Sequence, residues 1–413
     1  MFSAIYNLAL IFFAWGLLGQ YLFKGKYRSS LLARLGLGFP LFKAKPEEKV
    51  VWMHAVSMGE VRAMVALFHQ IQPHFTVVIS TTTETGLAEA LRSMPGAKAH
   101  FILPLDFSWT MRRLIKQINP SHLILCESDF WLHLLTLAKA HGAKISLING
   151  KVSERSCHRF KRFSFFTKRL FSSFDLICLQ NEIHYNRFVS MGVPYKKLHV
   201  TGNLKLEAPV KKMQNVESFR SKLGITSTDS VLVIGSTHHP EEEELLTALA
   251  PLLPSLKILL VPRHPERFDA VASLLERKSI PYHRYSNPAP ATANLILIDA
   301  MGQLNFCYQI ANLAIVAGSY GSQIGGHNIF EPIQQSIPVF FGPHMHAQQE
   351  LKDLVLSYQA GKEVPLDQLC NEVSLFFKNP TKYTQACQKL LDSIQGATQK
   401  TFDLIFATSQ EKK

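Results

Sequence analysis

Short, continuously apolar runs recur along the chain and alternate with longer amphipathic stretches. They lie at 50–56, 75–81, 100–105, 122–128, 144–150, 176–180 and 198–202, and again at 230–236, 257–263, 294–299, 313–319 and 337–343. Continuous apolar strands rich in β-branched residues are typical of a parallel sheet covered by helices on both faces. A polar stretch at about 208–229 separates the two groups. The pattern therefore predicts an α/β protein of two Rossmann-like domains facing a cleft, with ligands at the carboxyl ends of the strands.

The N-terminal run, residues 2–23, contains no charged residue. About 20 apolar residues are enough to cross the hydrocarbon core of a bilayer. Three basic residues follow within 24–28, and basic residues after a span favour a cytoplasmic location for the rest of the chain. We expect residues 1–23 to form a single-pass membrane anchor. Because Asn7 and Gln20 interrupt the run, an in-plane or buried helix is the alternative.

The composition indicates a basic surface and a reducing environment. Apolar residues make up 47% of the chain and charged residues 18%, which indicates a globular protein. A net charge of +13 favours anionic partners such as phosphate head groups, phosphorylated substrates or nucleic acid. The six cysteines form no CxxC pair, which is typical of buried thiols rather than a disulfide framework or a zinc site.

Residues 151–175 depart from the rest of the chain, with seven basic and two acidic residues among six phenylalanines. On one helix, a shared face would hold the following residues: Phe160, Phe163, Thr167, Leu170 and Phe174. Such a helix suits an anionic membrane surface. A core-facing helix with a solvated basic edge is the alternative. We do not expect nucleic-acid binding, because no RNP-like or KH-like motif accompanies the segment.

Polar residues gather where the predicted strands of the first domain end. Glu60 follows the first strand and a tight Ser-Met-Gly turn, so its carboxylate could take a proton from a nearby hydroxyl. The alternative is that Glu60 only interacts favourably with the N-terminus of the next helix. Glu127 and Asp129 follow the fourth strand, and Lys205 follows the last one. They indicate a ligand site or a network that holds another residue.

In the second domain, Arg263 follows a strand and lies between two prolines. A guanidinium held in this way suits a phosphate or a carboxylate. The glycine-rich loop at 318–332 leads into a helix expected to begin near His327 and Asn328, a place suited to phosphate. Glu331 could accept hydrogen bonds from ribose hydroxyls. The loop matches neither a Walker A sequence nor GxGxxG, which argues against a P-loop NTPase or a dinucleotide enzyme.

A metal site at the GSTHHPEEEELL stretch (235–246) is not expected. Neighbouring histidines point in different directions, and the glutamate run is typical of a solvated first helical turn.

Taken together, these stretches resemble the family of 3-deoxy-D-manno-octulosonic acid (Kdo) transferases of lipopolysaccharide biosynthesis. The matching stretches, in order between about 50 and 345, are HAVSMGEV, STTTETG, ESDFW, NGKVSERS, GNLKLE, GSTHHPEEE, VPRHPERF, DAMGQL and GGHNIFEP, followed by GPH. The resemblance implies a glycosyltransferase-B fold anchored in the inner membrane with its domains on the cytoplasmic side. It assigns 24–210 to the lipid acceptor and 211–413, with the C-terminal helices, to the nucleotide.

The resemblance also implies an inverting transfer from CMP-Kdo to a lipid A precursor, lipid IVA, without a metal or another cofactor. Glu60 would be the base, and Glu127 and Lys205 would help to stabilise the transition state. The implied CMP contacts are Pro262, Arg263, Met301, Gly302, Gln303, Asn328, Ile329, Phe330 and Glu331. Gln303 stands where the family often has an acid, and Asp129 where a longer glutamate is usual.

Three alternatives remain open at this point. The chain could use another nucleotide sugar, since a UDP-sugar carries two phosphates where CMP-Kdo carries one. It could be a basic scaffold that has kept the fold without activity. As a Kdo transferase, it could add more than one Kdo to each lipid, because members of the family differ in that number.

Overall fold

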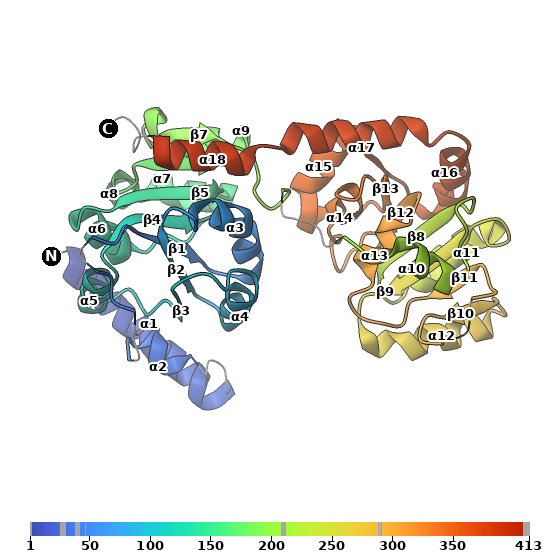
Figure 1. Ribbon diagram of the computed structural model, residues 1–413, viewed down its shortest axis with the longest axis horizontal. Coiled ribbons are helices and arrows are strands. Elements are labelled where there is room, and N and C mark those ends of the chain that lie inside the picture. The colour runs from blue at the N-terminus through green and yellow to red at the C-terminus, as the bar shows by residue number, and fades with distance from the viewer. Residues whose placement is uncertain are drawn as a thin grey trace. The chain divides into compact units, whose positions relative to one another are not determined.

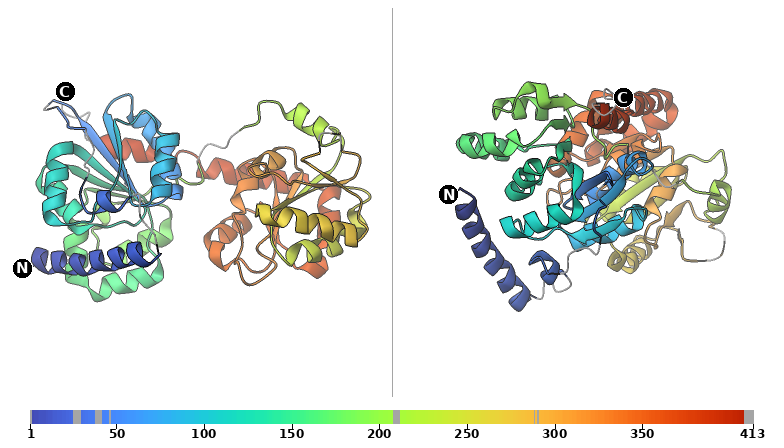
Figure 2. Two further views of the ribbon diagram at one scale, coloured as in Figure 1. Left: turned by 90° about the horizontal axis from the view of Figure 1, so that it is seen from below. Right: turned by 60° about the vertical axis from the view of Figure 1, so that its left-hand side comes forward.

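The computed structural model describes residues 2–24, 30–37, 42–45, 47–207, 212–287, 289 and 291–407. The chain divides into two compact units, which are described one at a time. Unit 1 comprises Met1–Pro209 and Ile394–Lys413, and unit 2 comprises Val210–Ser393. Each unit is a parallel sheet with helices on both faces (Figures 1 and 2). The expected boundary at 210/211 falls among residues outside the described ones.

The sheet of unit 1 has seven parallel strands in the order β3-β2-β1-β4-β5-β6-β7. The strands are β1 (Val50–Ala55), β2 (Thr76–Thr81), β3 (Ala99–Ile102), β4 (Pro120–Cys126), β5 (Lys144–Gly150), β6 (Leu176–Leu179) and β7 (Leu198–Val200). The helices between them are α3 (Met58–Ile71), α4 (Glu84–Ser93), α5 (Ser108–Ile118), α6 (Leu132–Ala140), α7 (Glu154–Arg162), α8 (Ser164–Ser172) and α9 (Glu182–Ser190). The strand order reverses between β1 and β4.

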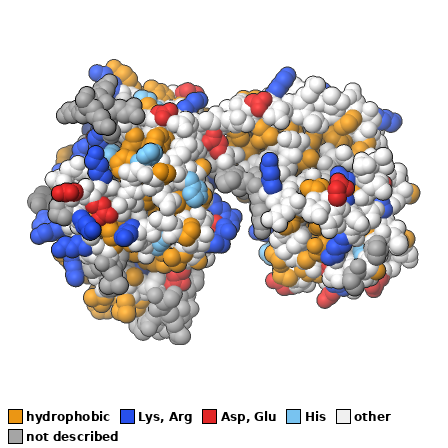
Figure 3. All heavy atoms as spheres, viewed as in Figure 1, with side chains coloured by type: hydrophobic (Ala, Val, Ile, Leu, Met, Phe, Trp, Pro, Cys, Tyr) orange, Lys and Arg blue, Asp and Glu red, His pale blue; other side chains and the backbone are white. Residues whose placement is uncertain are grey.

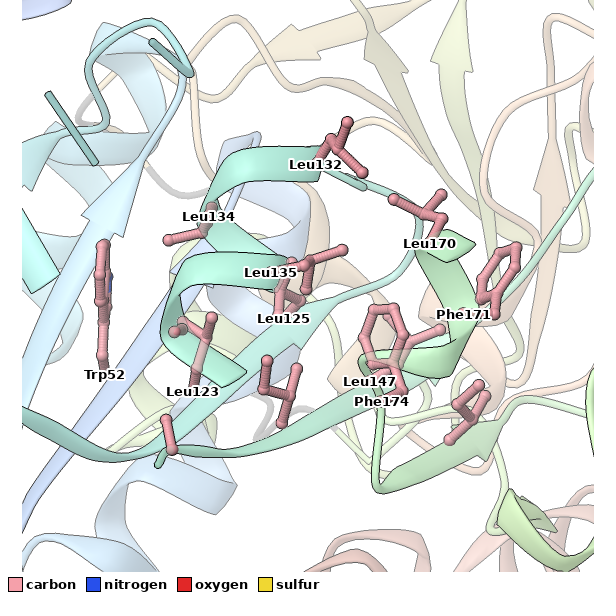
Figure 4. Close-up of a cluster of buried hydrophobic side chains, with 14 of the residues drawn as sticks. Trp52, Leu123, Leu125, Leu132, Leu134, Leu135, Leu147, Leu170, Phe171 and Phe174 are labelled. Atoms are coloured by element: carbon pink, nitrogen blue, oxygen red, sulfur yellow. The ribbon is translucent and has the colours of Figure 1, made fainter. Parts of the chain in front are cut away.

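Both faces of this sheet are buried, which explains why its strands read as continuous apolar runs. Side chains alternate between the two faces along a strand. Val50 and Trp52 of β1 belong to one buried hydrophobic cluster, and Figure 4 shows Trp52 with members of that cluster from β4, β5, α6 and α8. Val51 and Met53 pack on the opposite face, against α3.

The sheet of unit 2 also has seven parallel strands, in the order β10-β11-β9-β8-β12-β13-β14. The strands are β8 (Val231–Thr237), β9 (Lys257–Pro262), β10 (Tyr282–Arg284), β11 (Leu295–Leu297), β12 (Leu313–Val316), β13 (Val339–Phe341) and β14 (Gly361–Glu363). Its helices are α10 (Val216–Lys222), α11 (Glu241–Leu249), α12 (Phe268–Arg277), α13 (Leu304–Gln309), α14 (Phe330–Ile333), α15 (Gln349–Ser357), α16 (Leu366–Lys378) and α17 (Thr381–Ile394). The strand order reverses between β8 and β12. The two sheets confirm the predicted α/β class.

The C-terminal segment returns to unit 1, unlike the expected single domain of 211–413. The carboxylate of Glu207 accepts the backbone N–H of Ala397 at 2.8 Å and that of Thr398 at 2.7 Å, at the start of α18 (Ala397–Phe406). Phe406, near the end of α18, stacks on Phe75 with ring centroids 4.8 Å apart. Both contacts join residues far apart in the sequence, so no local pattern reveals them.

The N-terminal run forms α1 (Phe2–Lys24), which lies along the outside of unit 1 (Figure 2). The side chain of Asn7 donates to Ser108 Oγ at 3.0 Å and accepts the Ser108 backbone N–H at 3.1 Å, at the start of α5. Ile5, Phe12 and Trp15 of α1 are exposed. Asn7, which interrupts the apolar run, is therefore one of the residues that attach α1 to the unit, together with Ser3, which hydrogen-bonds to His133, and the buried Leu10.

Among the described residues, no helix combines the length and the apolar character that crossing a membrane requires. Lys26 and Arg28, two of the basic residues on which the anchor expectation rests, lie outside the described residues. A separate short helix, α2 (Leu31–Arg34), follows.

The basic, phenylalanine-rich segment is two helices rather than one. α7 ends at Arg162 and α8 begins at Ser164, with Phe163 between them, so the predicted shared helical face does not form. Leu170 and Phe174 are buried in the core of unit 1, whereas Phe163 and Phe165 are exposed. Lys and Arg side chains are spread over the face of unit 1 seen in Figure 3. The segment is thus core-facing in its second half and exposes aromatic and basic side chains at its middle.

Candidate active site

In unit 1, polar side chains meet where the strand order reverses. β1 and β4 are parallel neighbours. Glu60 lies in the first turn of α3, after β1, and Glu127 directly follows β4. The point of reversal in an open parallel sheet is where a crevice forms at the carboxyl ends of the strands and where ligands bind.

The Glu60 carboxylate is held by the turn that precedes it. Its Oε2 accepts the backbone N–H of Val56 at 2.8 Å, and its Oε1 accepts the Ser57 hydroxyl at 3.4 Å. Burial raises the pKa of Glu60 above its ordinary value, and the nearby Glu127 charge raises it further, whereas the Val56 N–H and Lys205 act in the opposite direction. A carboxylate with a raised pKa is a stronger base once it is ionised, which suits proton abstraction.

Glu127 is a buried carboxylate with two ammonium partners. Its Oε1 lies 2.5 Å from Lys205 Nζ and its Oε2 lies 2.8 Å from Lys151 Nζ. Asn149 donates to Oε1 from its side chain at 3.2 Å. Lys205 also passes over the start of α3, since a Cβ added at Gly59 would lie 3.8 Å from Lys205 Nζ. The structure therefore gathers Glu127 and Lys205, both predicted from the sequence, beside the helix that carries Glu60.

Lys151 is a member of this cluster that the sequence interpretation missed. In the sequence it is one of the seven basic residues at 151–175. A usable signal was present, because Lys151 directly follows β5 just as Glu127 directly follows the neighbouring strand β4.

Asp129 belongs to a separate hydrogen-bonded network. Its Oδ2 accepts the Trp131 indole N–H at 2.7 Å and lies 2.9 Å from Nε2 of the buried His54. His54 Nδ1 in turn lies 2.8 Å from the Ser80 hydroxyl of β2. Asp129 thus connects the loop after β4 to the core of the sheet.

In unit 2, the expected nucleotide contacts begin at the end of β9. Pro262 is the last residue of that strand and is buried, and Arg263 follows it with an exposed side chain. The Arg263 backbone N–H donates to the Thr237 carbonyl at 3.1 Å, which fixes the turn to the end of β8. The guanidinium therefore extends from a fixed backbone, as the flanking prolines predicted.

Met301, Gly302 and Gln303 form the turn before α13. Met301 is exposed, and Gly302 has a φ of +78°, a left-handed conformation that favours glycine. Gln303 immediately precedes α13 and accepts the Tyr285 hydroxyl at 3.4 Å. The amide at position 303 is thus already engaged within the unit.

The segment from Asn328 to Glu331 differs from the prediction. α14 begins at Phe330, after the expected start near His327 and Asn328, and has only four residues. A helix this short does not provide the N-terminal phosphate site that was predicted. Asn328 Oδ1 accepts the Phe330 N–H at 3.0 Å, and its Nδ2 donates to Glu331 at 3.4 Å. Ile329 and Phe330 are buried. Their side chains are therefore not available to a ligand, and the Phe330 backbone N–H is already bonded to Asn328.

The glutamate run at the start of α11 is solvated only in part, unlike the prediction, since Glu243 and Glu244 are exposed. Glu241 and Glu242 are buried. Glu241 accepts the backbone N–H groups of Gly318 at 2.7 Å and Tyr320 at 2.9 Å, so it holds the glycine-rich loop after β12. In the described part of the chain, no group of three or more His, Cys, Asp or Glu side chains is arranged to hold a metal ion.

Two doubly wound units with polar side chains at the carboxyl ends of their strands define a class of α/β proteins in which ligands bind at those strand ends. A solved glycosyltransferase from Rickettsia africae superposes with a TM-score of 0.59 at 13% identity, covering 88% of this chain and 99% of that structure. This likeness shows the shared fold of two Rossmann-like units.

Sequence comparison identifies the family. The model for the 3-deoxy-D-manno-octulosonic-acid transferase family matches residues 29–208. A Kdo transferase of Chlamydia trachomatis serovar A is 35% identical, covering 93% of this chain and 91% of the relative. One from Haemophilus influenzae is 31% identical, covering 92% and 91%. The chain belongs to the Kdo transferase family, a family of glycosyltransferases in lipopolysaccharide biosynthesis, which confirms the resemblance inferred from its motifs.

Proposed function

We propose that the chain transfers Kdo from CMP-Kdo to a hydroxyl of a lipid A precursor, lipid IVA, with inversion of the anomeric centre and Glu60 as the base. The observation that carries the proposal is the Glu60 carboxylate itself. It is buried, has a raised pKa, and is oriented by the Val56 N–H at the switch point of unit 1. A general base of this kind contributes about 10²–10⁴-fold to a reaction.

On the acceptor side, Glu60 removes the proton of the attacking hydroxyl. Lys205 supplies positive charge close by, and its ammonium group is held at 2.5 Å by Glu127. Because Glu127 also holds Lys151 at 2.8 Å, the cluster keeps one more positive than negative charge without Glu60. This balance favours the negative charge that develops on the hydroxyl oxygen during attack.

On the donor side, the residues around Arg263 bind CMP. As the bond between the anomeric carbon and the phosphate oxygen breaks, its electron pair passes to the phosphate. The Arg263 guanidinium offsets that charge through charge-assisted hydrogen bonds. The turn from Met301 to Gln303 and the segment from Asn328 to Glu331 hold the nucleoside. No step in this scheme requires a metal or another cofactor.

We also propose that α1 attaches the chain to the inner membrane, with both units on the cytoplasmic side. The proposal is supported by the charge-free run at 2–23 and by the exposed Ile5, Phe12 and Trp15 on α1. Such side chains can enter the apolar boundary of a bilayer.

The test of the function is the mass of the lipid product. The purified chain is incubated with lipid IVA and CMP-Kdo generated in place, and the lipid is weighed by mass spectrometry. We expect the lipid to gain whole Kdo increments, whose number counts the transfers. A parallel reaction with a UDP-sugar should leave the lipid unchanged. An unchanged lipid with CMP-Kdo, or transfer from the UDP-sugar alone, would contradict the proposal.

A further inference from the structure

Two histidines face each other at the switch point of unit 2. His238 directly follows β8, and His327 lies in the loop between β12 and α14. β8 and β12 are parallel neighbours, and the strand order reverses between them. The Nε2 atoms of the two rings are 2.7 Å apart, and the ring planes are inclined by only 15°. The pair therefore occupies in unit 2 the place that Glu60 and Glu127 occupy in unit 1.

The bond between the two Nε2 atoms determines where the protons lie. One ring must donate its Nε2–H, and the other must accept with a bare Nε2. The accepting neutral ring then carries its own proton on Nδ1, and the donating ring has a bare Nδ1. A neutral pair thus retains one ring nitrogen that can take up a further proton without breaking the bond.

The surroundings keep the pair neutral near pH 7. The charged and titratable groups that face it are Glu241 and Glu242 from α11 and Arg263 and His264 from the turn after β9. Burial lowers the pKa of His238, and burial together with the neighbouring cationic groups lowers the pKa of His327 to about 4. Glu242 is within 3.3 Å of Arg267, so its charge is partly compensated.

The backbone around His327 leaves space for its ring. Gly318 has a φ of +73°, and a Cβ added there would lie 2.6 Å from His327 Cδ2. Glu241 fixes this glycine by accepting its N–H at 2.7 Å. The buried carboxylate, the left-handed glycine and the imidazole together form a built arrangement rather than a chance contact on the surface.

We propose that His238 and His327, together with Arg263, bind the phosphate of the nucleotide and that the histidine pair takes up one proton as the phosphate binds. The inference rests on the proposed function and extends it to residues that the family resemblance does not assign. A phosphate beside the pair favours its charged form, because an opposite charge nearby stabilises imidazolium. The protonated pair then donates a charge-assisted hydrogen bond to the phosphate. The same positive charge offsets the negative charge that the phosphate gains when Kdo departs.

Calorimetry of CMP binding to the full chain tests this proposal. Titrations at about pH 7.5, above the second phosphate pKa of about 6, are run in two buffers with different ionisation enthalpies. The difference in heat gives the number of protons taken up. We expect uptake approaching about one proton per CMP, with an affinity that rises by up to roughly tenfold per unit fall in pH. Cytidine, which lacks the phosphate, should bind without uptake.

The variants His327→Asn and His238→Asn should bind CMP about tenfold more weakly and lose most of the uptake. His283→Asn, on the edge strand β10 of the same unit, is the matched control and should behave as the wild type. Protonation of CMP itself is common to all variants, so differences between them isolate the pair.

Four results would overturn the proposal. CMP binding to the wild type without proton uptake would reject the histidine pair while leaving the CMP-linked donor intact, and this measurement needs no variant to fold. Uptake that is unchanged in both pair variants, or that is equally large with cytidine, would have the same meaning. A wild type that binds no CMP would reject the proposed function together with this inference.

Discussion

Nζ of Lys151 lies 2.8 Å from Oε2 of Glu127. Lys205 occupies the other oxygen of the same carboxylate, so Glu127 joins two lysines that are far apart in the sequence. The two lysines are not equivalent, because Lys205 lies over the start of the helix that carries Glu60 and lowers the pKa of Glu60. Replacing Lys205 and Lys151 in turn therefore tests whether the charge of Lys205 acts on Glu60, since both lysines pair with the same carboxylate.

The wild-type rate of transfer should fall as the pH falls through the pKa of Glu60, because only the ionised carboxylate accepts a proton. The pKa of Glu60 is raised, chiefly by burial. The acidic limb of the pH profile of kcat/KM should therefore lie above the ordinary glutamate value of about 4.3. A profile that stays flat down to that ordinary value would contradict a buried base.

Lys205→Met should move this acidic limb to higher pH, since it removes a cation that favours the ionised form of Glu60. It should also lower the rate at high pH, where Glu60 is already ionised. Lys151→Met is the matched control, because it also removes one ammonium partner of Glu127 but keeps Lys205 beside Glu60, and it should move the limb less. Equal shifts in the two variants would show that Lys205 has no special relation to Glu60.

Glu241→Gln should lower the stability of unit 2 by about 1–3 kcal/mol, because one of the two backbone N–H groups on the loop loses its acceptor. Glu243→Gln is the control on the same helix. Its carboxylate is 55% exposed and lies 3.0 Å from Lys278, and such a surface pair contributes little. Urea unfolding measures both variants. A Glu241→Gln protein as stable as Glu243→Gln would contradict the role of Glu241 in holding the loop.

Glu207→Ala should loosen α18 from unit 1, since the carboxylate accepts the first two N–H groups of that helix and the Thr398 hydroxyl. Limited proteolysis should then cut near residue 394 sooner than in the wild type, while unit 2 stays intact. Unchanged cleavage kinetics would show that the apolar packing of α18, including Phe406 on Phe75, secures the helix without the carboxylate.

The sequence predicted the central strands of both sheets because these strands are buried on both faces. β1 and β8, for example, are buried along their whole length. It did not predict β10 or β14, which are three-residue edge strands with partly exposed side chains and therefore have no apolar run.

The candidate site was predictable where a polar residue directly follows an apolar strand, as with Glu60, Glu127 and Arg263. Two of its supporting residues were missed, and only one of them, Glu241, lacks a local signal. The sequence pattern indicates a solvated Glu241. The residue is buried because it contacts the loop after β12, which is far away in the sequence. Lys151 also follows an apolar strand, but it belongs to the basic segment at 151–175, whose charge indicates a solvent-exposed or membrane-facing surface.

The central claim is that Glu60 removes the proton of the acceptor hydroxyl, and the rate of Kdo transfer by Glu60→Gln tests it most directly. Glutamine keeps the size of the side chain and an oxygen for the Val56 N–H but cannot take the proton. Transfer should fall about 10²–10⁴-fold while the affinity for CMP stays unchanged. Glu84→Gln, in the corresponding first turn of α4 and exposed, should transfer at the wild-type rate. Near-wild-type transfer by Glu60→Gln would contradict the account.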